Sequence, residues 1–307
     1  MPLVRMAGYQ GSGSILTRSV LALKDELATH GNGWDIQVEQ NVTTTGETSA
    51  SMFRSIDIGS RQIGYFASGY LSARVPELAA LDLPFCVQDR HTALRALDGS
   101  AGRQLASALE KKTGYKVLGY WDNGFRHVSN SLRPIHNMQD CKGLRIRTLD
   151  SAVYRDALAA LGFAPITSDV KDLGRLVQSG EVDAQENPLT NFANFGLWQY
   201  HPHVSMTGHF FGVLLLVCNR EWFKGLHAGR QEELLNAAEH ATALQRQLAA
   251  GEDEALTKQL SARGIQILAR ESLDIHSMRQ ATRFIVDRQR KYLPPQLVRA
   301  YLDQVAS

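Results

Sequence analysis

The sequence predicts an α/β protein made of two units that are joined by long strands. Two observations predict this class: apolar residues alternate with polar ones in short runs, and apolar residues recur at helical spacing between those runs. The strand, helix, strand order that results is typical of parallel βαβ units. The pattern occurs once in the first third of the chain and again between residues 144 and 184.

The first unit opens with a strand at residues 3–7, and the turn "GYQGSGS" leads from it into an amphipathic helix at about 15–28. Gly31 and Gly33 are expected to end that helix, because glycine is common just beyond helix C-termini. Trp34, Ile36 and Val38 then alternate with polar residues and predict a second strand. A helix at about 50–58 and a strand at 62–67 complete the unit.

The second unit follows two strands that we expect to be separate, at 117–121 and 126–128. A strand at 144–148 is followed by the helical segment "DSAVYRDALAALG", with Asp150 or Ser151 as N-cap and Gly162 beyond its end. Another helix starts at Ser168 and ends at Gly180, before a short strand "EVDAQ". A long helical stretch at about 231–261, interrupted near Gly251, comes last.

The composition excludes several classes of function. The 33 basic and 31 acidic residues give a net charge of +2 and are mixed along the 307 residues, so no nucleic-acid or membrane footprint is predicted. The longest purely apolar run, 213–218, is far shorter than the roughly 20 residues that span a bilayer. Cys86, Cys141 and Cys218 favour free thiols over a Cys141–Cys218 bridge. His201 and His203 flank Pro202 and predict an exposed turn rather than a metal site.

Polar loops follow several of the expected strands. Ligands of open α/β sheets bind where strands end, and this rule brings together "GYQGS", "FASG", "RTLDS" and "QENP". The glycine-rich first loop lacks both nucleotide-binding patterns, so we interpret it as a turn. Arg126, Arg145 and Arg147 lie in strands, where an arginine is commonly at a sheet edge or in an ion pair. The functional alternative is that a guanidinium grips a ligand carboxylate in a bidentate manner.

Several motifs resemble the solute receptors of TRAP transporters, the C4-dicarboxylate-receptor type of the DctP family. In that family a G-L-[KR]-I-R strand is followed by a helix, a G-x-x-P turn, a second helix and D-G-Q-E-N-P. The chain has these motifs in order and at matching spacing, at 143–147, 162–165 and 183–188. Further resemblances are "VPELAALDLPF", "YWDNGFRHVSNS" and "TGH", so the similarity extends over essentially the whole chain.

The resemblance implies a two-lobed, periplasmic-binding-protein-like fold with hinge strands and a long helix crossing both lobes. The expected lobes are 1–123 plus about 212–250, and 124–211 plus about 251–307. It also implies a periplasmic location after removal of a leader peptide, no catalytic activity, no cofactor and no metal. The expected partners are a small organic acid and the permease subunits of a TRAP transporter, with no nucleic acid, and the receptor itself is expected to be a monomer.

The resemblance also assigns roles to site residues. Arg147 is expected to form the main salt bridge to a ligand carboxylate, assisted by Arg126 and by the amide of Asn187. Val170 stands where the family often has phenylalanine, which leaves room beside the ligand. The remaining expected ligand residues come from the loops at the strand ends: Tyr9, Gln10, Glu47, Phe66, Ser68, His209 and Phe211.

The aromatic residues in these loops predict a monocarboxylate with an apolar or aromatic tail, such as a 2-oxo or 2-hydroxy acid, over succinate or a sialic or uronic acid. They are Tyr9, Tyr65, Phe66, Phe192, Phe210 and Phe211. The alternative is that these rings belong to the core. Two other functions stay open: an α/β enzyme for a carboxylate substrate, with His209 or His127 as general base, and a sensory ligand-binding module.

Overall fold

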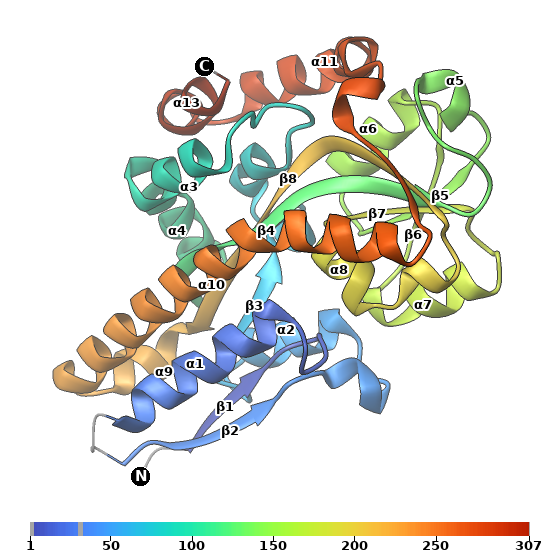
Figure 1. Ribbon diagram of the computed structural model, residues 1–307. Helices are drawn as coiled ribbons and strands as arrows, with labels where there is room; N and C mark the ends of the chain where they lie inside the picture. Colours follow the sequence, from blue (N-terminus) through green and yellow to red (C-terminus); the bar gives the residue numbers. More distant parts are fainter. Residues whose placement is uncertain (1–2, 30–32, 307) are drawn as a thin grey trace.

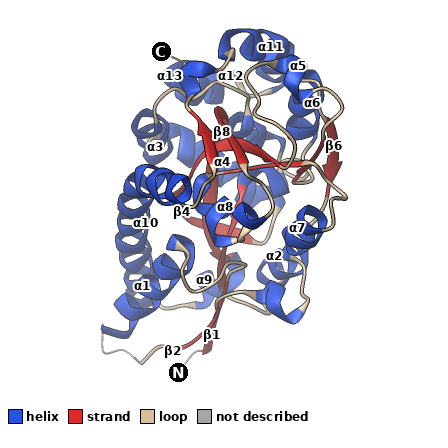
Figure 2. Cartoon of the chain, turned by 45° about the vertical axis from the view of Figure 1, so that its right-hand side comes forward, coloured by secondary structure: helices blue, strands red, loops and turns tan. Residues whose placement is uncertain are grey.

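The computed structural model describes residues 3–29 and 33–306, which form one mixed sheet flanked by helices (Figures 1 and 2). Gly31, expected to end the first helix, lies outside the described residues. The described strands follow the order β2-β1-β3-β8-β4-β7-β5-β6, and β9 pairs with β8. Their bounds are β1 Leu3–Ala7, β2 Asp35–Glu39, β3 Ile63–Ala67, β4 Tyr115–Asn130, β5 Arg145–Thr148, β6 Ala164–Thr167, β7 Ala184–Asn187, β8 His203–Asn219 and β9 Gln266–Leu268.

The helices at 15–29, 49–57, 152–160 and 170–178 match the expected ranges closely. The N-cap of the helix in the "SDVKDL" segment is Asp169 rather than Ser168. The carboxylate of Asp169 accepts a hydrogen bond from the Lys171 amide, and the helix itself begins at Val170. The bounds are α1 Ile15–Thr29, α2 Ser49–Asp57, α3 Arg90–Asp98, α4 Ser100–Lys112, α5 Met138–Cys141, α6 Ala152–Ala160, α7 Val170–Gln178, α8 Leu189–Asn194, α9 Arg220–Gly225, α10 Ala228–Ala262, α11 Ile275–Tyr292, α12 Pro295–Leu297 and α13 Asp303–Val305.

Two long antiparallel strands, β4 and β8, join the two halves of the sheet (Figure 1). The expectation of separate strands at 117–121 and 126–128 is wrong, because β4 runs through both. Its pairing with β8 shifts register three times, and two of the shifts flank Gly124 and Arg126. Gly124 has φ +87°, a conformation that residues with side chains rarely adopt. This glycine allows β4 to form a bulge and to continue, although the sequence around it resembles a turn.

Helix α10 crosses the molecule and packs against α1 in one half and α8 in the other (Figure 1). The expected interruption near Gly251 is absent, and the helix continues through it. A single glycine costs a helix only about 1 kcal/mol relative to alanine, which tertiary packing outweighs. The chain then returns along α11, which contacts α6, to the C-terminal segment, which contacts α3.

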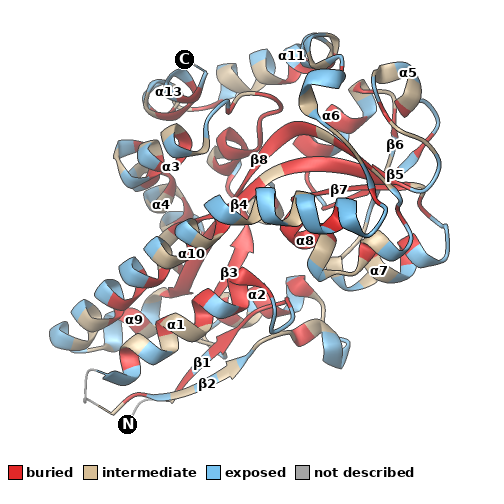
Figure 3. Cartoon of the chain, viewed as in Figure 1, coloured by how far each residue is buried: buried red, intermediate tan, exposed pale blue. Residues whose placement is uncertain are grey.

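The core follows the same division into halves. One buried cluster lies around β1, β3 and the adjoining parts of β4 and β8, and two smaller clusters lie on either side of β5 and β7 (Figure 3). Cys86, Cys141 and Cys218 are free thiols, as expected. No helix within the described residues has the length and apolar character that crossing a membrane requires.

Candidate ligand-binding site

Four buried polar side chains come from neighbouring strands in the second half of the sheet. Arg126 comes from β4, Glu186 and Asn187 from β7, and Arg147 from β5, and these three strands are neighbours in the sheet. The side chains are at most 5% exposed. We call these four residues the arginine cluster.

Within the arginine cluster, Arg126 is neutralised by Glu186. Nη2 of Arg126 donates to Glu186 Oε1 at 2.9 Å and to the Glu186 carbonyl at 2.7 Å, and Nε donates to Oε2. The Thr148 hydroxyl donates to the same carboxylate at 2.8 Å. Burial alone would raise the pKa of Glu186, but Arg126 and the hydrogen bonds lower it to about 2. Glu186 is therefore ionised and compensates the charge of Arg126.

Arg147 has no such partner. Its Nε donates to the Ser168 hydroxyl at 3.1 Å and its Nη2 to the Ser168 carbonyl at 2.6 Å, although the side chain is only 2% exposed. No described residue forms an ion pair with it. By contrast, Arg145, two residues earlier in β5, is paired with Asp183. The ion-pair interpretation thus holds for Arg126 and Arg145, whereas Arg147 is a buried cation without a counterion among the described residues.

The two arginines of the cluster are bound in the same way and leave the same atom unused. In each, the edge formed by Nε and Nη2 carries the hydrogen bonds, and no described residue accepts one from Nη1. A buried charge is stable only when it is paired and hydrogen-bonded. The arrangement therefore fits an anion at Arg147 whose charge the protein does not itself supply.

Asn187 is oriented by its neighbours. Its Oδ1 accepts from Arg126 Nη2 and from Asn191 Nδ2, each at 3.2 Å, and its Nδ2 donates to Gln185 Oε1 at 2.6 Å. Gln185 continues the network through Ser129 to His201. The expected exposed turn at His201 is wrong, since the ring is fully buried and bonded to Ser129. The polar stretch after β7 is thus held rigid, with one N–H of Asn187 unused by the described residues.

Hydrogen bonds connect the arginine cluster's half of the molecule with the other half. Gln10 Nε2, after β1, donates to Asn191 Oδ1 at 2.8 Å. The Ser49 hydroxyl, at the start of α2, donates to Asp169 Oδ2 at 2.7 Å, and the Ser49 amide donates to Oδ1 at 3.3 Å. These contacts connect the two halves directly.

We expect Ser49→Ala to weaken ligand binding about tenfold or more, because it removes one neutral-to-charged hydrogen bond between the two halves, worth roughly 1.5–3 kcal/mol. Titration calorimetry measures the effect. Ser60→Ala, which changes an exposed hydroxyl bonded to the Ser55 carbonyl of α2, is the control. Equal affinities for the two variants would show that the Ser49–Asp169 contact does not contribute to closure.

Tyrosine side chains surround Arg126. Its guanidinium lies 5.5 Å from the centre of the Tyr154 ring, and that ring packs against Phe210 at 4.2 Å. Burial raises the pKa of Tyr9 well above 10, and the charges of Tyr70 and Tyr65 raise it further, whereas Arg126 lowers it. Tyr9 therefore lies within the electrostatic reach of Arg126 and keeps its hydroxyl proton. Gln10, beside it, is fully buried.

Several residues expected at the site are engaged in contacts with other parts of the protein. Phe66 is in the core, with its ring packed between Phe53 and Tyr115. Phe211 is paired with Phe125 of β4, and their rings are in contact. Phe210 is paired with Arg126, so Phe210 rather than Phe211 lies on the same face of the sheet as Arg126. Glu47 is held by Arg61 through two 2.8 Å bonds. Tyr65 and Phe192 are also buried in the core clusters.

His209 and Val170 are closer to expectation. His209 Nε2 lies 3.6 Å from Glu186 Oε2, and its Nδ1 lies 2.7 Å from the Thr207 hydroxyl. Burial lowers the pKa of His209, which favours the neutral ring. Val170, the first residue of α7, is half-buried and packs against the core cluster of the opposite half.

Sequence reasoning missed a buried acid close to the arginine cluster. Ser68, an expected site residue, donates its hydroxyl to Asp82 Oδ1 at 2.7 Å, and the Tyr154 hydroxyl lies 3.4 Å from the same oxygen. Oδ2 of Asp82 is buried without a partner among the described residues. Burial raises the pKa of Asp82 to about 7, against the lowering effects of Ser68 and Arg126. The only sequence signal was an acid inside the apolar run "LAALDLPF".

We expect Asp82 to make folding pH-dependent. Because its pKa is raised from 3.8 to about 7 on folding, the folded state binds more protons than the unfolded state, and the free energy of unfolding falls as the pH rises through this window. The Asp82→Asn variant lacks the titrating carboxyl group and does not lose this stability. The difference in the free energy of unfolding between the variant and the wild type should therefore shift in favour of the variant as the pH rises from 4 to 7. Urea unfolding at several pH values measures it. Asp150→Asn, at an exposed carboxylate bonded to Arg155, is the comparison variant. A difference between Asp82→Asn and the wild type that does not change with pH would contradict the assignment.

Known proteins of one family resemble the chain over almost its whole length. The family model of bacterial extracellular solute-binding protein, family 7, matches residues 6–291. A solute-binding protein of Verminephrobacter eiseniae is 30% identical over 238 residues, covering 78% of this chain and 70% of that protein. The 2,3-diketo-L-gulonate-binding periplasmic protein YiaO of Escherichia coli is 31% identical over 226 residues, covering 74% and 68%.

Solved structures agree with these relatives. A TRAP periplasmic solute-binding protein from Polaromonas sp. JS666, bound to D-erythronate, is 26% identical and superposes with a TM-score of 0.91 over 98% of both chains. The sugar acid binding protein DctPAm of Advenella mimigardefordensis, in complex with galactonate, has a TM-score of 0.93 over 100% of this chain and 99% of that chain at 22% identity, which supports the two-lobed fold. The chain therefore belongs to the bacterial extracellular solute-binding proteins of family 7, the DctP family of TRAP solute receptors.

Proposed function

We propose that this receptor binds the carboxylate of a small organic acid, with Arg147 as the principal clamp. The observation that carries the proposal is the buried guanidinium of Arg147, which has no counterion among the described residues. A ligand carboxylate supplies the missing charge and accepts a charge-assisted hydrogen bond from Nη1. Nη1 of Arg126 and the unused N–H of Asn187 are the assisting donors.

The charge of the arginine cluster favours a monocarboxylate. Glu186 cancels the charge of Arg126, so the cluster keeps one uncompensated positive charge, that of Arg147. One carboxylate balances this charge. A second ligand carboxylate in the same buried space would remain unpaired, and an unpaired buried polar group costs at least about 1–3 kcal/mol.

The rest of the ligand is proposed to carry hydroxyl or oxo groups. An aromatic wall was expected from residues that include Phe66 and Phe211, and these two rings pack against Phe53 and Phe125 within the protein. Besides Phe210, the side chains near Arg126 are tyrosines and the Ser68–Asp82 pair, whose hydroxyl and carboxyl groups suit polar substituents. The relatives named above bind 2,3-diketo-L-gulonate, D-erythronate and galactonate. We therefore favour a short 2-hydroxy or 2-oxo monocarboxylic acid over one with an apolar tail.

We propose that binding closes two lobes around the ligand. We keep the lobe boundaries predicted from the sequence with one change: the C-terminal segment from about 293 onward is assigned to the first lobe. This segment contacts α3, and its apolar residues belong to the first core cluster. Gly124 and Gly208 both have positive φ and lie in the long strands where bending is expected. A ligand that contacts both lobes shifts the population toward the closed form.

The closed receptor is proposed to act in the periplasm as a monomer and to deliver its ligand to the permease subunits of a TRAP transporter. Receptor function is favoured over catalysis by the two candidate bases. The side chain of His127 is directed away from Arg126, and the ring of His209 lies between the Thr207 hydroxyl at Nδ1 and the Glu186 carboxylate, 3.6 Å from Nε2. A sensory role would use the same binding site. Deletion of the receptor distinguishes the two roles, because uptake of the acid fails only if the receptor serves transport.

A thermal-shift panel of small acids tests the proposal. We expect the melting temperature to rise with D-erythronate, other aldonates or short 2-oxo acids, and to rise less with succinate at the same concentration. The ligand should be recovered unchanged, as proton NMR of the mixture would verify. Stabilisation by dicarboxylates alone would overturn the monocarboxylate assignment, and conversion of the acid to a product would overturn the receptor assignment.

A further inference from the structure

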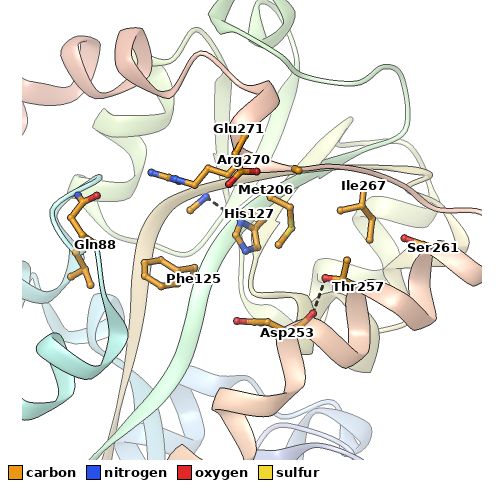
Figure 4. A pocket seen from close by; sticks show the side chains of 13 residues that line it. Gln88, Phe125, His127, Met206, Asp253, Thr257, Ser261, Ile267, Arg270 and Glu271 are labelled. Carbon is orange, nitrogen blue, oxygen red and sulfur yellow. Dashed lines mark hydrogen bonds between the residues drawn. The ribbon is translucent and has the colours of Figure 1, made fainter.

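A cavity lies on the face of the sheet opposite to the side chain of Arg126. Arg126 and His127 are neighbours in β4, and consecutive side chains of a strand point to opposite faces. Arg126 contacts Glu186, whereas His127 lines a cavity of about 470 Å³ (Figure 4). The cavity lies between the long strands β4 and β8, helix α10 and the segment 267–271.

Part of the cavity wall is apolar. Phe125 of β4, Met206 of β8 and Ile267 of β9 line it together with the buried Val87, and the first three are only half-buried. The Thr257 hydroxyl is turned back to the Asp253 carbonyl at 2.7 Å, as Figure 4 shows, whereas Asp253 and Ser261 of the same helix add polar side chains to the lining. The apolar part of the wall suits the hydrocarbon part of a small ligand.

One side of the cavity carries a cation without a counterion among the described residues. Arg270 is half-buried, and Nη1 donates to the Thr207 carbonyl, but no described residue forms an ion pair with this guanidinium. Burial lowers the pKa of Arg270 and the nearby Arg279 lowers it further, against the effect of Glu271. A guanidinium stays charged nonetheless, so the wall offers an anion site.

His127 adds a hydrogen-bond donor. Its Nδ1 lies 3.1 Å from the Gly208 amide nitrogen and accepts that proton. Burial lowers the pKa of His127 to about 3, so the ring is neutral at pH 7. A neutral imidazole that accepts at Nδ1 carries its proton on Nε2, and no described residue accepts a hydrogen bond from Nε2.

The acidic residues at the cavity do not supply the missing charge. Asp253 is paired with Arg90, which also lies 3.3 Å from Asp122. Glu271 is exposed at the rim, next to Arg270 in the chain, and it forms no ion pair with Arg270. The inner wall is therefore cationic and apolar, and the negative charge is at the rim or already paired.

We propose that this hinge cavity is a second binding site, for a small organic anion with one carboxylate and an apolar body. The carboxylate pairs with Arg270 and accepts from His127, and the apolar body packs against Phe125, Met206 and Ile267. Because the walls come from both hinge strands and from α10, a ligand that fills the cavity in this arrangement of the two halves favours that arrangement.

Methyl NMR of the full chain tests the proposal with 4-phenylbutyrate as the probe. The protein is labelled with ¹³C-methyl methionine and carries Arg147→Ala, so that binding at the arginine cluster is suppressed. The Met206 signal, assigned with Met206→Leu, should shift saturably, while that of Met52, buried in the first core cluster, should not. The neutral analogue 4-phenylbutanol should bind at least tenfold more weakly.

In the Arg147→Ala protein, the additional substitution Arg270→Gln should weaken the binding of 4-phenylbutyrate at least tenfold. Arg283→Gln, which alters an exposed arginine paired with Asp287, should leave it unchanged. The proposal is overturned if Met206 does not respond at millimolar probe, if the acid and the alcohol bind equally, or if a folded Arg270→Gln variant keeps its affinity. The difference in affinity between the acid and the alcohol tests the anion site even if that variant does not fold.

Discussion

Replacing Arg147 by alanine is expected to lower the affinity for the acid ligand by about 100- to 1,000-fold or more. The reason is that truncation leaves a buried ligand carboxylate without its charge partner, which typically costs roughly 3–5 kcal/mol. Arg147→Lys should weaken binding nearly as much, because an ammonium group cannot reproduce the planar fork that also bonds Ser168. Titration calorimetry with a stabilising acid from the panel gives the affinities.

The same strand provides a matched control. Arg145 lies two residues before Arg147, but its guanidinium is half-exposed and paired with Asp183. Arg145→Ala removes the same type of side chain from β5 and should change the affinity less than threefold. If Arg147→Ala bound the acid as tightly as Arg145→Ala does, the clamp would have to be assigned to another residue.

Glu186→Gln is expected to destabilise the protein by about 3 kcal/mol or more at pH 7. The substitution leaves the guanidinium of Arg126 buried without its counterion, and breaking a buried ion pair on one side costs roughly 3–5 kcal/mol. The urea midpoint reports the change. The variant's cluster would also carry two positive charges, so its ligand preference should move from mono- toward dicarboxylates.

Glu181→Gln is the appropriate comparison, because Glu181 forms an exposed ion pair with Arg175 and such pairs contribute about 0–1 kcal/mol. A loss of stability no larger in Glu186→Gln than in Glu181→Gln would mean that Arg126 is compensated by another group. Unchanged preference between succinate and D-erythronate in a folded Glu186→Gln variant would count against the charge argument for a monocarboxylate.

Most of the fold could be predicted because local patterns and tertiary structure agree. The elements β1, α1, β2, α6 and α7 lie within a residue or two of the ranges expected from periodicity and end signals. The misses occurred where tertiary contacts override local signals. Gly124 interrupts the sequence pattern of β4, but pairing with β8 carries the strand through a bulge. Gly251 is likewise retained inside α10 by the packing of its neighbours.

The candidate site was predictable only in part, for a physical reason. A strand-end arginine within a family motif identifies Arg147, but the sequence does not say which acid stands beside which arginine. The pairing of Arg126 with Glu186 depends on the register between β4 and β7. In the same way, the register between β4 and β8 decides that Phe210 rather than Phe211 is paired with Arg126. Asp82 carries no motif, and only its burial beside Ser68 reveals it.

A crystal structure of the receptor with the acid that gives the largest thermal shift tests the central claim most directly. The account predicts a single ligand carboxylate between the two lobes, with an oxygen at hydrogen-bond distance, about 2.7–3.2 Å, from Nη1 of Arg147. It also predicts that Arg126 keeps its bonds to Glu186 while the ligand is bound. A ligand whose carboxylate lies away from Arg147, or that fills this site without any anionic group, would contradict it.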